Sequence, residues 1–149
     1  MRKMLVFDMD GTIADLYGVE NWLEMLQNSN TFPYESAKPL YDMTELNNTL
    51  NILKEKGWRI AIVTWTAKNT TKEYHKAVNK AKKNWLDNYN FPYDEYHCVK
   101  YGTTKANSVR KKADFQILID DNKKVRDGWT LGTTVNAEHD ITLFLKALI

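Results

Sequence analysis

The sequence predicts an α/β fold in which a doubly wound, mainly parallel five-stranded sheet carries helices on both faces. The main reason is a set of three short, largely apolar runs, at residues 4–7, 59–63 and 116–119. None of them alternates with polar residues, and strands without this alternation are buried on both faces, as in a parallel sheet covered by helices. Segments with helical spacing separate the runs, and such alternation of strands and helices is typical of doubly wound folds.

The remaining elements follow from weaker local patterns. Two further strands are expected at residues 96–99 and 130–135. Helices are expected over residues 19–27, 43–56, 71–89, 105–112 and 141–148. The three prolines, Pro33, Pro39 and Pro92, sit in loop-like surroundings.

Two of the expected helices have recognisable ends. Gly57 is a stop signal for the helix before it. The helix over 71–89 has several candidate caps, Asn69, Thr70 and Thr71, and Glu73 is placed for a capping box against Thr70. His75 and the lysines that follow it, up to Lys83, are interpreted as a solvated face of that helix.

Length and composition indicate a single domain over residues 1–149. With 43% hydrophobic and 27% charged residues the balance is globular, and there is no internal repeat, low-complexity tract or Gly/Ser linker. No apolar run approaches the roughly 20 residues of a membrane-spanning helix, and the one behind the basic N-terminus ends at Asp8, too early for a signal peptide. A lone Cys98 fits a reducing compartment. We therefore expect a cytoplasmic protein without a membrane partner. The net charge of +2 is too small to indicate a nucleic-acid binder by itself.

Polar side chains follow three of the predicted strands, where doubly wound folds collect their functional residues. The three segments are residues 8–12 (Asp-Met-Asp-Gly-Thr), 64–66 (Thr-Trp-Thr) and 120–122 (Asp-Asp-Asn). Four carboxylates brought together repel one another unless a cation neutralises them, and hard oxygen ligands suit Mg²⁺. A metal on these acids, the hydroxyl and N–H groups of residues 64–66 and the ammonium of Lys105 together make a receptor for a phosphate group. The chemistry implied is phosphoryl transfer.

These segments resemble the four motifs of the haloacid dehalogenase (HAD) superfamily of phosphatases, in the same order. The first motif is similar to residues 5–12 and the second to residues 60–64. The third, a lysine before the last motif, is best matched by Lys105, although Lys100 or a residue of 110–112 could reach the same place. The fourth, an apolar strand that ends in two acids, is similar to residues 117–121.

The resemblance implies that Asp8 is the nucleophile, which attacks phosphorus and forms an aspartyl-phosphate. Asp10 would protonate the leaving oxygen and then take a proton from the hydrolytic water, while its backbone carbonyl helps to hold the metal. Thr64 would hydrogen-bond the transferring phosphoryl group. Lys105 would offset the charge of that group and of Asp8.

The resemblance also implies a Mg²⁺ site. Asp8 and Asp10 would share the ion with Asp120 or Asp121, and the sequence favours neither of the last two. Gly11 permits the sharp turn after the nucleophile. The remaining candidates for substrate binding are Thr12, Trp65 and Thr66.

Several of these residues have alternative interpretations. Trp65 could stack on a substrate base or sugar, or pack at the rim of the core. Thr66 could bind phosphate or only begin the next loop. The three histidines, His75, His97 and His139, lack metal-binding spacing and are interpreted as structural, as is Cys98.

An open site is expected, which suits either a bulky substrate, such as a nucleic-acid end or a phosphoprotein, or a small one that a partner subunit helps to enclose. Residues 15–56 form at most a minimal helical cap, and one of its two helices should cover the sheet. The residues around Asp8 and Asp120 look most like those of small bacterial and phage-type phosphatases near the 5'(3')-deoxyribonucleotidases, which implies a small monophosphate such as a (deoxy)nucleotide. Trp65 departs from that pattern, because those enzymes usually carry a small polar residue there.

Two other functions are kept open. A polynucleotide 3'-end phosphatase would bind a nucleic-acid end through the basic segment 76–83 and the aromatic residues Trp65, Trp85 and Tyr89. A phosphate-binding module that has lost its chemistry is the other, and the intact pair Asp8 and Asp10 argues against it. No oligomeric state is implied by either.

Overall fold

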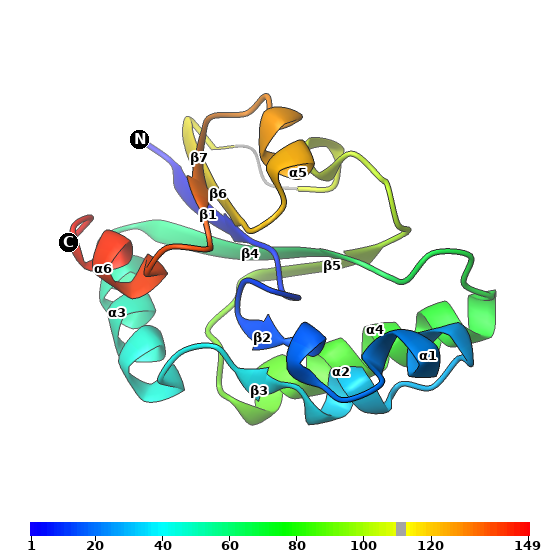
Figure 1. Ribbon diagram of the computed structural model, residues 1–149. Helices are drawn as coiled ribbons and strands as arrows, with labels where there is room; N and C mark the ends of the chain where they lie inside the picture. The colour runs from blue at the N-terminus through cyan, green and yellow to red at the C-terminus, as the bar shows by residue number, and fades with distance from the viewer. Residues whose placement is uncertain (110–112) are drawn as a thin grey trace.

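The computed structural model describes residues 1–109 and 113–149, and at its centre lies a five-stranded sheet (Figure 1). The strands are β1 (Lys3–Phe7), β4 (Trp58–Trp65), β5 (Glu95–Val99), β6 (Phe115–Asp120) and β7 (Thr133–Asn136). They lie in the order β5-β4-β1-β6-β7, and every neighbouring pair is parallel. The helices that cover the sheet are α3 (Met43–Glu55), α4 (Lys72–Asn88), α5 (Lys123–Asp127) and α6 (Ile141–Lys146). The predicted doubly wound, parallel sheet with helices on both faces is confirmed.

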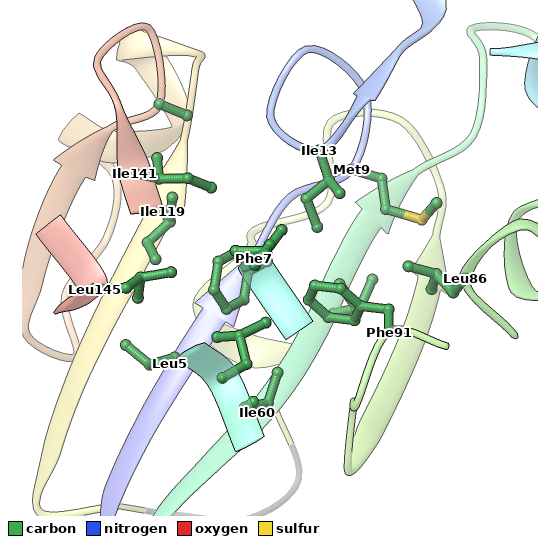
Figure 2. Close-up of a cluster of buried hydrophobic side chains, with 14 of the residues drawn as sticks. Leu5, Phe7, Met9, Ile13, Ile60, Leu86, Phe91, Ile119, Ile141 and Leu145 are labelled. Carbon is green, nitrogen blue, oxygen red and sulfur yellow. The ribbon is translucent and has the colours of Figure 1, made fainter. Parts of the chain in front are cut away.

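The central strand β1 supplies side chains to both faces, because successive residues of a strand point to opposite sides. Leu5 and Phe7 join the core beneath α3, α4 and α6, where Figure 2 shows them among other buried side chains. Met4 and Val6 join a second core, on the face that α5 covers. All four side chains are at most 1% exposed, which explains why this strand shows no polar alternation.

Between β1 and α3 the chain makes an insertion beside the sheet. Its elements are β2 (Ala14–Asp15), the 3-10 turn η1 (Leu16–Gly18), α1 (Trp22–Gln27), α2 (Phe32–Ser36) and β3 (Lys38–Pro39). Leu16, Leu26 and Tyr34 from the insertion form an apolar cluster with Tyr74 and Val78 of α4. This cluster holds α1 and α2 alongside α4, as Figure 1 shows.

The predicted helix ends agree with the structure at Gly57, which follows α3 with a φ of +94°. The predicted capping box between Thr70 and Glu73 is wrong. The cap of α4 is Thr71, whose hydroxyl accepts a hydrogen bond from the N–H of Tyr74 at 3.1 Å. A tyrosine in that third helical position has no carboxylate to return the bond, so no box forms.

The predicted helix over 105–112 is also wrong where the structure describes it. The chain makes only a 3-10 turn there, η2 (Lys105–Asn107), and residues 110–112 lie outside the described part. Pro33 and Pro39 are not in loops but in α2 and β3. Pro33 lies in the first turn of α2, where N–H groups have no hydrogen-bond partner within the helix, so its missing N–H costs nothing there. Pro39 lies in β3, which belongs to a two-stranded ribbon with free edges, where proline is also tolerated.

Within residues 1–109 and 113–149, no helix is both long and apolar enough to cross a membrane.

Candidate active site

The candidate site lies at the carboxyl end of β1, where the direction of strand order reverses. The chain passes from β1 outward through β4 to β5, and then crosses to β6 and β7 on the other side of β1. Asp8 directly follows β1, and its N–H still donates to the carbonyl of Ile119 in β6 at 3.0 Å. Thr64 and Asp120 come from the ends of β4 and β6, so the predicted convergence of the three strand ends is observed.

Three carboxylates form a compact acidic cluster at this edge. Asp8, Asp120 and Asp121 each offer an oxygen, and these oxygens all lie within 4.8 Å of one another. The Thr12 hydroxyl lies between two of the acids, 3.2 Å from Oδ2 of Asp8 and 3.3 Å from Oδ1 of Asp121. Gly11 has a φ of +79°, and a Cβ there would lie 2.3 Å from Oδ2 of Asp121. A side chain at position 11 would therefore invade the cluster.

The electrostatics of the cluster fit a divalent cation. Burial, followed by the neighbouring charge of Asp8, raises the pKa of Asp120 to about 6 and that of Asp121 to about 7. Raised values mean that the crowded carboxylates resist ionisation in the absence of more positive charge. Hard carboxylate oxygens are the ligands that Mg²⁺ prefers. Asp8, Asp120 and Asp121 are therefore the residues that could hold such an ion.

Lys105 supplies one positive charge inside the cluster. Its Nζ donates to Oδ1 of Asp8 at 2.9 Å and to Oδ2 of Asp120 at 2.8 Å, and the residue is only 5% exposed. Burial acts to lower the pKa of this lysine, but the two carboxylates outweigh burial and raise it. The Nζ atom also lies 5.3 Å from the centre of the Trp65 ring. Of the alternatives, Lys100 is exposed at the surface, and residues 110–112 lie outside the described part.

A second buried lysine, Lys82, was not predicted to belong to the site. Its Nζ donates to Oδ2 of Asp10 at 2.7 Å, to the hydroxyl of Thr64 at 2.7 Å and to the carbonyl of Trp65 at 2.8 Å. The interpretation of its segment as a solvated face is wrong here, because Lys82 is 1% exposed. A sequence signal existed, since Lys82 falls on the same stripe of α4 as Val78 and other apolar residues.

The carboxylate of Asp10 is directed to Lys82 and does not belong to the acidic cluster. Burial raises the pKa of Asp10, although Lys82 opposes that shift. A raised pKa favours the protonated carboxyl, which is the form a general acid needs. Its predicted contribution to the metal through the backbone carbonyl stays a prediction.

A cavity of about 650 Å³ opens over the site. Asp8, Asp10, Lys105, Asp120 and Asp121 lie in its wall, next to six aromatic side chains. The aromatic residues are Tyr17, Trp22, Tyr34, Trp65, Tyr74 and Tyr101. The cavity thus combines a strongly charged part with an apolar, aromatic part, to which the insertion contributes. Five of the aromatic residues were not identified as site residues by any sequence pattern: Tyr17, Trp22, Tyr34, Tyr74 and Tyr101.

The predicted phosphate cradle at residues 64–66 is present only in part. Trp65 lines the cavity, and its Nε1 donates to the carbonyl of Thr103 at 2.9 Å. Thr66 also lines it, but its N–H already donates to the carbonyl of Val99 at 2.9 Å, and its hydroxyl lies 3.2 Å from Nδ1 of His75. The N–H of Thr66 is therefore not available to a phosphate. Thr64 is fully buried, with its hydroxyl on Lys82.

Comparisons with known proteins find a similar structure but no matching family model or curated sequence. No protein-family model matches the chain, and no curated protein matches its sequence. The D,D-heptose 1,7-bisphosphate phosphatase of Burkholderia thailandensis has a similar structure, with a TM-score of 0.59 at 13% sequence identity. The match covers 99% of this chain and 98% of that chain. The two proteins therefore share their fold over nearly their whole lengths.

Proposed function

We propose that this protein is a Mg²⁺-dependent phosphomonoester hydrolase of the HAD superfamily, acting on a small monophosphate. The observation that carries the proposal is the position of Asp8, which lies in the cavity wall and touches the ammonium of Lys105 within the acidic cluster. The structural similarity to a phosphatase and the four sequence motifs support the same assignment.

Asp8 is the nucleophile in this proposal. One of its carboxylate oxygens forms a bond to phosphorus while the bond from phosphorus to the ester oxygen breaks. Asp10 gives its proton to the departing oxygen, so that the product leaves as a neutral alcohol. Asp10 then takes a proton from a water whose oxygen attacks phosphorus, which restores the Asp8 carboxylate and releases inorganic phosphate.

The positive groups around Asp8 offset the charge that gathers during both steps. Lys105 holds one oxygen of Asp8 and bridges it to Asp120, so its charge offsets the repulsion between the two carboxylates. Mg²⁺ would be held by Asp8, Asp120 and Asp121, and when bound it supplies charge that makes the phosphorus more electrophilic. The Thr12 hydroxyl lies within hydrogen-bond distance of both Asp8 and Asp121 and so helps to fix these two carboxylates.

The cavity favours a substrate with a flat, apolar group beside its phosphate. Aromatic walls stack well on nucleobases, which supports a (deoxy)nucleotide. The aromatic argument for a nucleic-acid end is weaker than the sequence implied, because Trp85 is 3% exposed and its Nε1 donates to the carbonyl of Ala37. Within residues 15–56, we assign the cap to α1 and α2, since α3 covers the sheet.

The test is phosphate release from a panel of deoxynucleotides, sugar phosphates and a 3'-phosphorylated oligonucleotide, with Mg²⁺ and with EDTA. We expect metal-dependent release, highest with a nucleotide. Asp8→Asn should fold and give no turnover, whereas Asp127→Asn, which changes an exposed carboxylate by the same atoms, should match the wild type. Full activity of Asp8→Asn would reject the nucleophile, and no release from any compound by the folded wild type would reject the function.

A further inference from the structure

Lys82 is buried inside the site, yet it has no hydrogen bond to offer a substrate. A lysine ammonium carries three N–H donors. All three are engaged, by Oδ2 of Asp10, the hydroxyl of Thr64 and the carbonyl of Trp65, at 2.7 to 2.8 Å. The residue does not line the cavity, and the ring of Tyr34 from α2 lies 4.9 Å from its Nζ. Direct binding of a phosphate by Lys82 would break contacts that the fold provides.

We propose that Lys82 is a positioning residue that fixes the carboxyl of Asp10 for proton exchange with the leaving group. By holding Oδ2, Lys82 leaves Oδ1 as the oxygen that carries the proton. This inference rests on the proposed function, because it assigns Asp10 the part of general acid. Lys82 itself touches neither the substrate nor the reacting atoms.

The surroundings of Lys82 make the position of its ammonium well defined. Its backbone belongs to the middle of a 17-residue helix, α4, whose neighbouring side chains are packed in the core. Thr64 and Trp65 hold the ammonium from the end of β4, inside the sheet. Catalytic groups need their supporting side chains locked by packing and hydrogen bonds, and two anchors on the interior strand β4 meet this need.

Thr64 and Trp65 accept the two remaining N–H donors of the ammonium, as a buried ion pair requires, and they also fix its position. Burying an ammonium costs free energy, which one opposite charge does not necessarily return. Here Thr64 and Trp65 specify where the ammonium sits, and Lys82 in turn specifies where Asp10 sits. The two buried lysines therefore serve different acids, since Lys105 contacts Asp8 and Asp120.

The experiment compares Lys82→Met with Lys83→Met. Methionine keeps most of the lysine hydrocarbon and removes the charge, and Lys83 is an exposed neighbour on the same helix. For each variant, kcat and KM are measured with p-nitrophenyl phosphate, whose leaving group needs little protonation, and with glycerol phosphate, whose leaving group needs it. We expect Lys82→Met to lower kcat/KM for glycerol phosphate about 10²-fold, the usual contribution of a general acid, because this ratio reports the steps up to departure of the leaving group. The loss of kcat/KM with p-nitrophenyl phosphate should be at least tenfold smaller, and Lys83→Met should match the wild type.

A double-mutant cycle covers the case in which Lys82→Met does not fold. Asp10→Asn combined with Lys82→Met removes both buried charges, and its kcat is compared with that of Asp10→Asn alone. A residue that acts through Asp10 should add no further loss once the acid is gone. Equal losses of kcat/KM on both substrates, wild-type rates in Lys82→Met, or a further loss in the double variant each overturn the positioning role. An inactive wild type overturns the proposed function first and this inference with it, so the two failures are distinguishable.

Discussion

Replacing Lys105 by methionine should leave a protein that is unstable without metal and is partly restored by Mg²⁺. The substitution keeps the buried hydrocarbon but removes the ammonium that Asp8 and Asp120 share at 2.9 and 2.8 Å. Removing one partner of a buried ion pair costs about 3 to 5 kcal/mol. For a chain of this size each kcal/mol lowers the melting temperature by roughly 2–4 °C, so we expect a decrease of about 6–20 °C.

The sign of the pH dependence follows from Asp120. Its pKa in the folded protein is already raised to about 6 by burial and by the charge of Asp8, and loss of the ammonium, which opposes that shift, raises it further. A carboxyl with a raised pKa destabilises the fold only when it is ionised, so its cost is absent at low pH and grows as the pH rises through the folded pKa. The difference in melting temperature between Lys105→Met and wild type should therefore widen between pH 5 and pH 8.

The assay is thermal unfolding at both pH values, with EDTA and with Mg²⁺, and Lys100→Met is the control because it removes an exposed lysine from the same segment. Mg²⁺ should stabilise Lys105→Met more than it stabilises the wild type, since it replaces the missing charge. Equal melting temperatures for Lys105→Met and Lys100→Met at pH 8 without metal would refute the reasoning about this buried pair.

Three further outcomes are expected. Gly11→Ala should lower the melting temperature and weaken stabilisation by Mg²⁺, because its Cβ would meet Asp121. The control is Gly102→Ala, which has a similar φ of +85° but open space around it, so it should lose stability and keep the Mg²⁺ effect. The pKa values of Asp120 and Asp121 are raised to about 6 and 7, so protons compete with Mg²⁺ for these carboxylates. Calorimetric titration should show that the Mg²⁺ affinity rises from pH 5 to pH 8 and that protons are released on binding. A constant affinity would contradict this. Trp22→Ala should raise KM for a deoxynucleotide more than for glycerol phosphate at nearly constant kcat, because Trp22 lines the cavity and belongs to α1 of the insertion. Equal changes in both KM values would argue against aromatic recognition.

The sheet could be predicted because its signal is local. Each long strand is a run of apolar residues whose burial on both faces leaves no polar alternation, as Val6 and Phe7 illustrate on opposite faces of β1. The convergence of Asp8 and Asp120 followed from the same signal, since parallel strands end at one edge of the sheet. The short helix α2 could not be predicted in this way, because Pro33 reads as a loop residue unless the helix start is known.

The position of Lys82 shows a different limit. Its partners Asp10 and Thr64 lie 72 and 18 residues away in the chain, so nothing local marks the lysine as buried. Lysine is normally a surface residue, and only its place on the apolar stripe of α4 separates it from exposed Lys83. The same applies to Tyr34, which reaches the cavity because the insertion folds back onto α4.

The ribbon of β2 and β3 makes the insertion a closed loop with a fixed base. Ala14 pairs with Pro39, and the N–H of Leu40 donates to the carbonyl of Ile13 at 2.8 Å, so the chain enters and leaves the insertion at neighbouring points. The entropy lost in closing a loop depends only weakly on its length. A change in the length of the segment between the ribbon strands would therefore cost little closure entropy, and Asp8 lies outside that segment, at the end of β1. The surface proposed to recognise the substrate and the residue proposed to react thus belong to different parts of the chain.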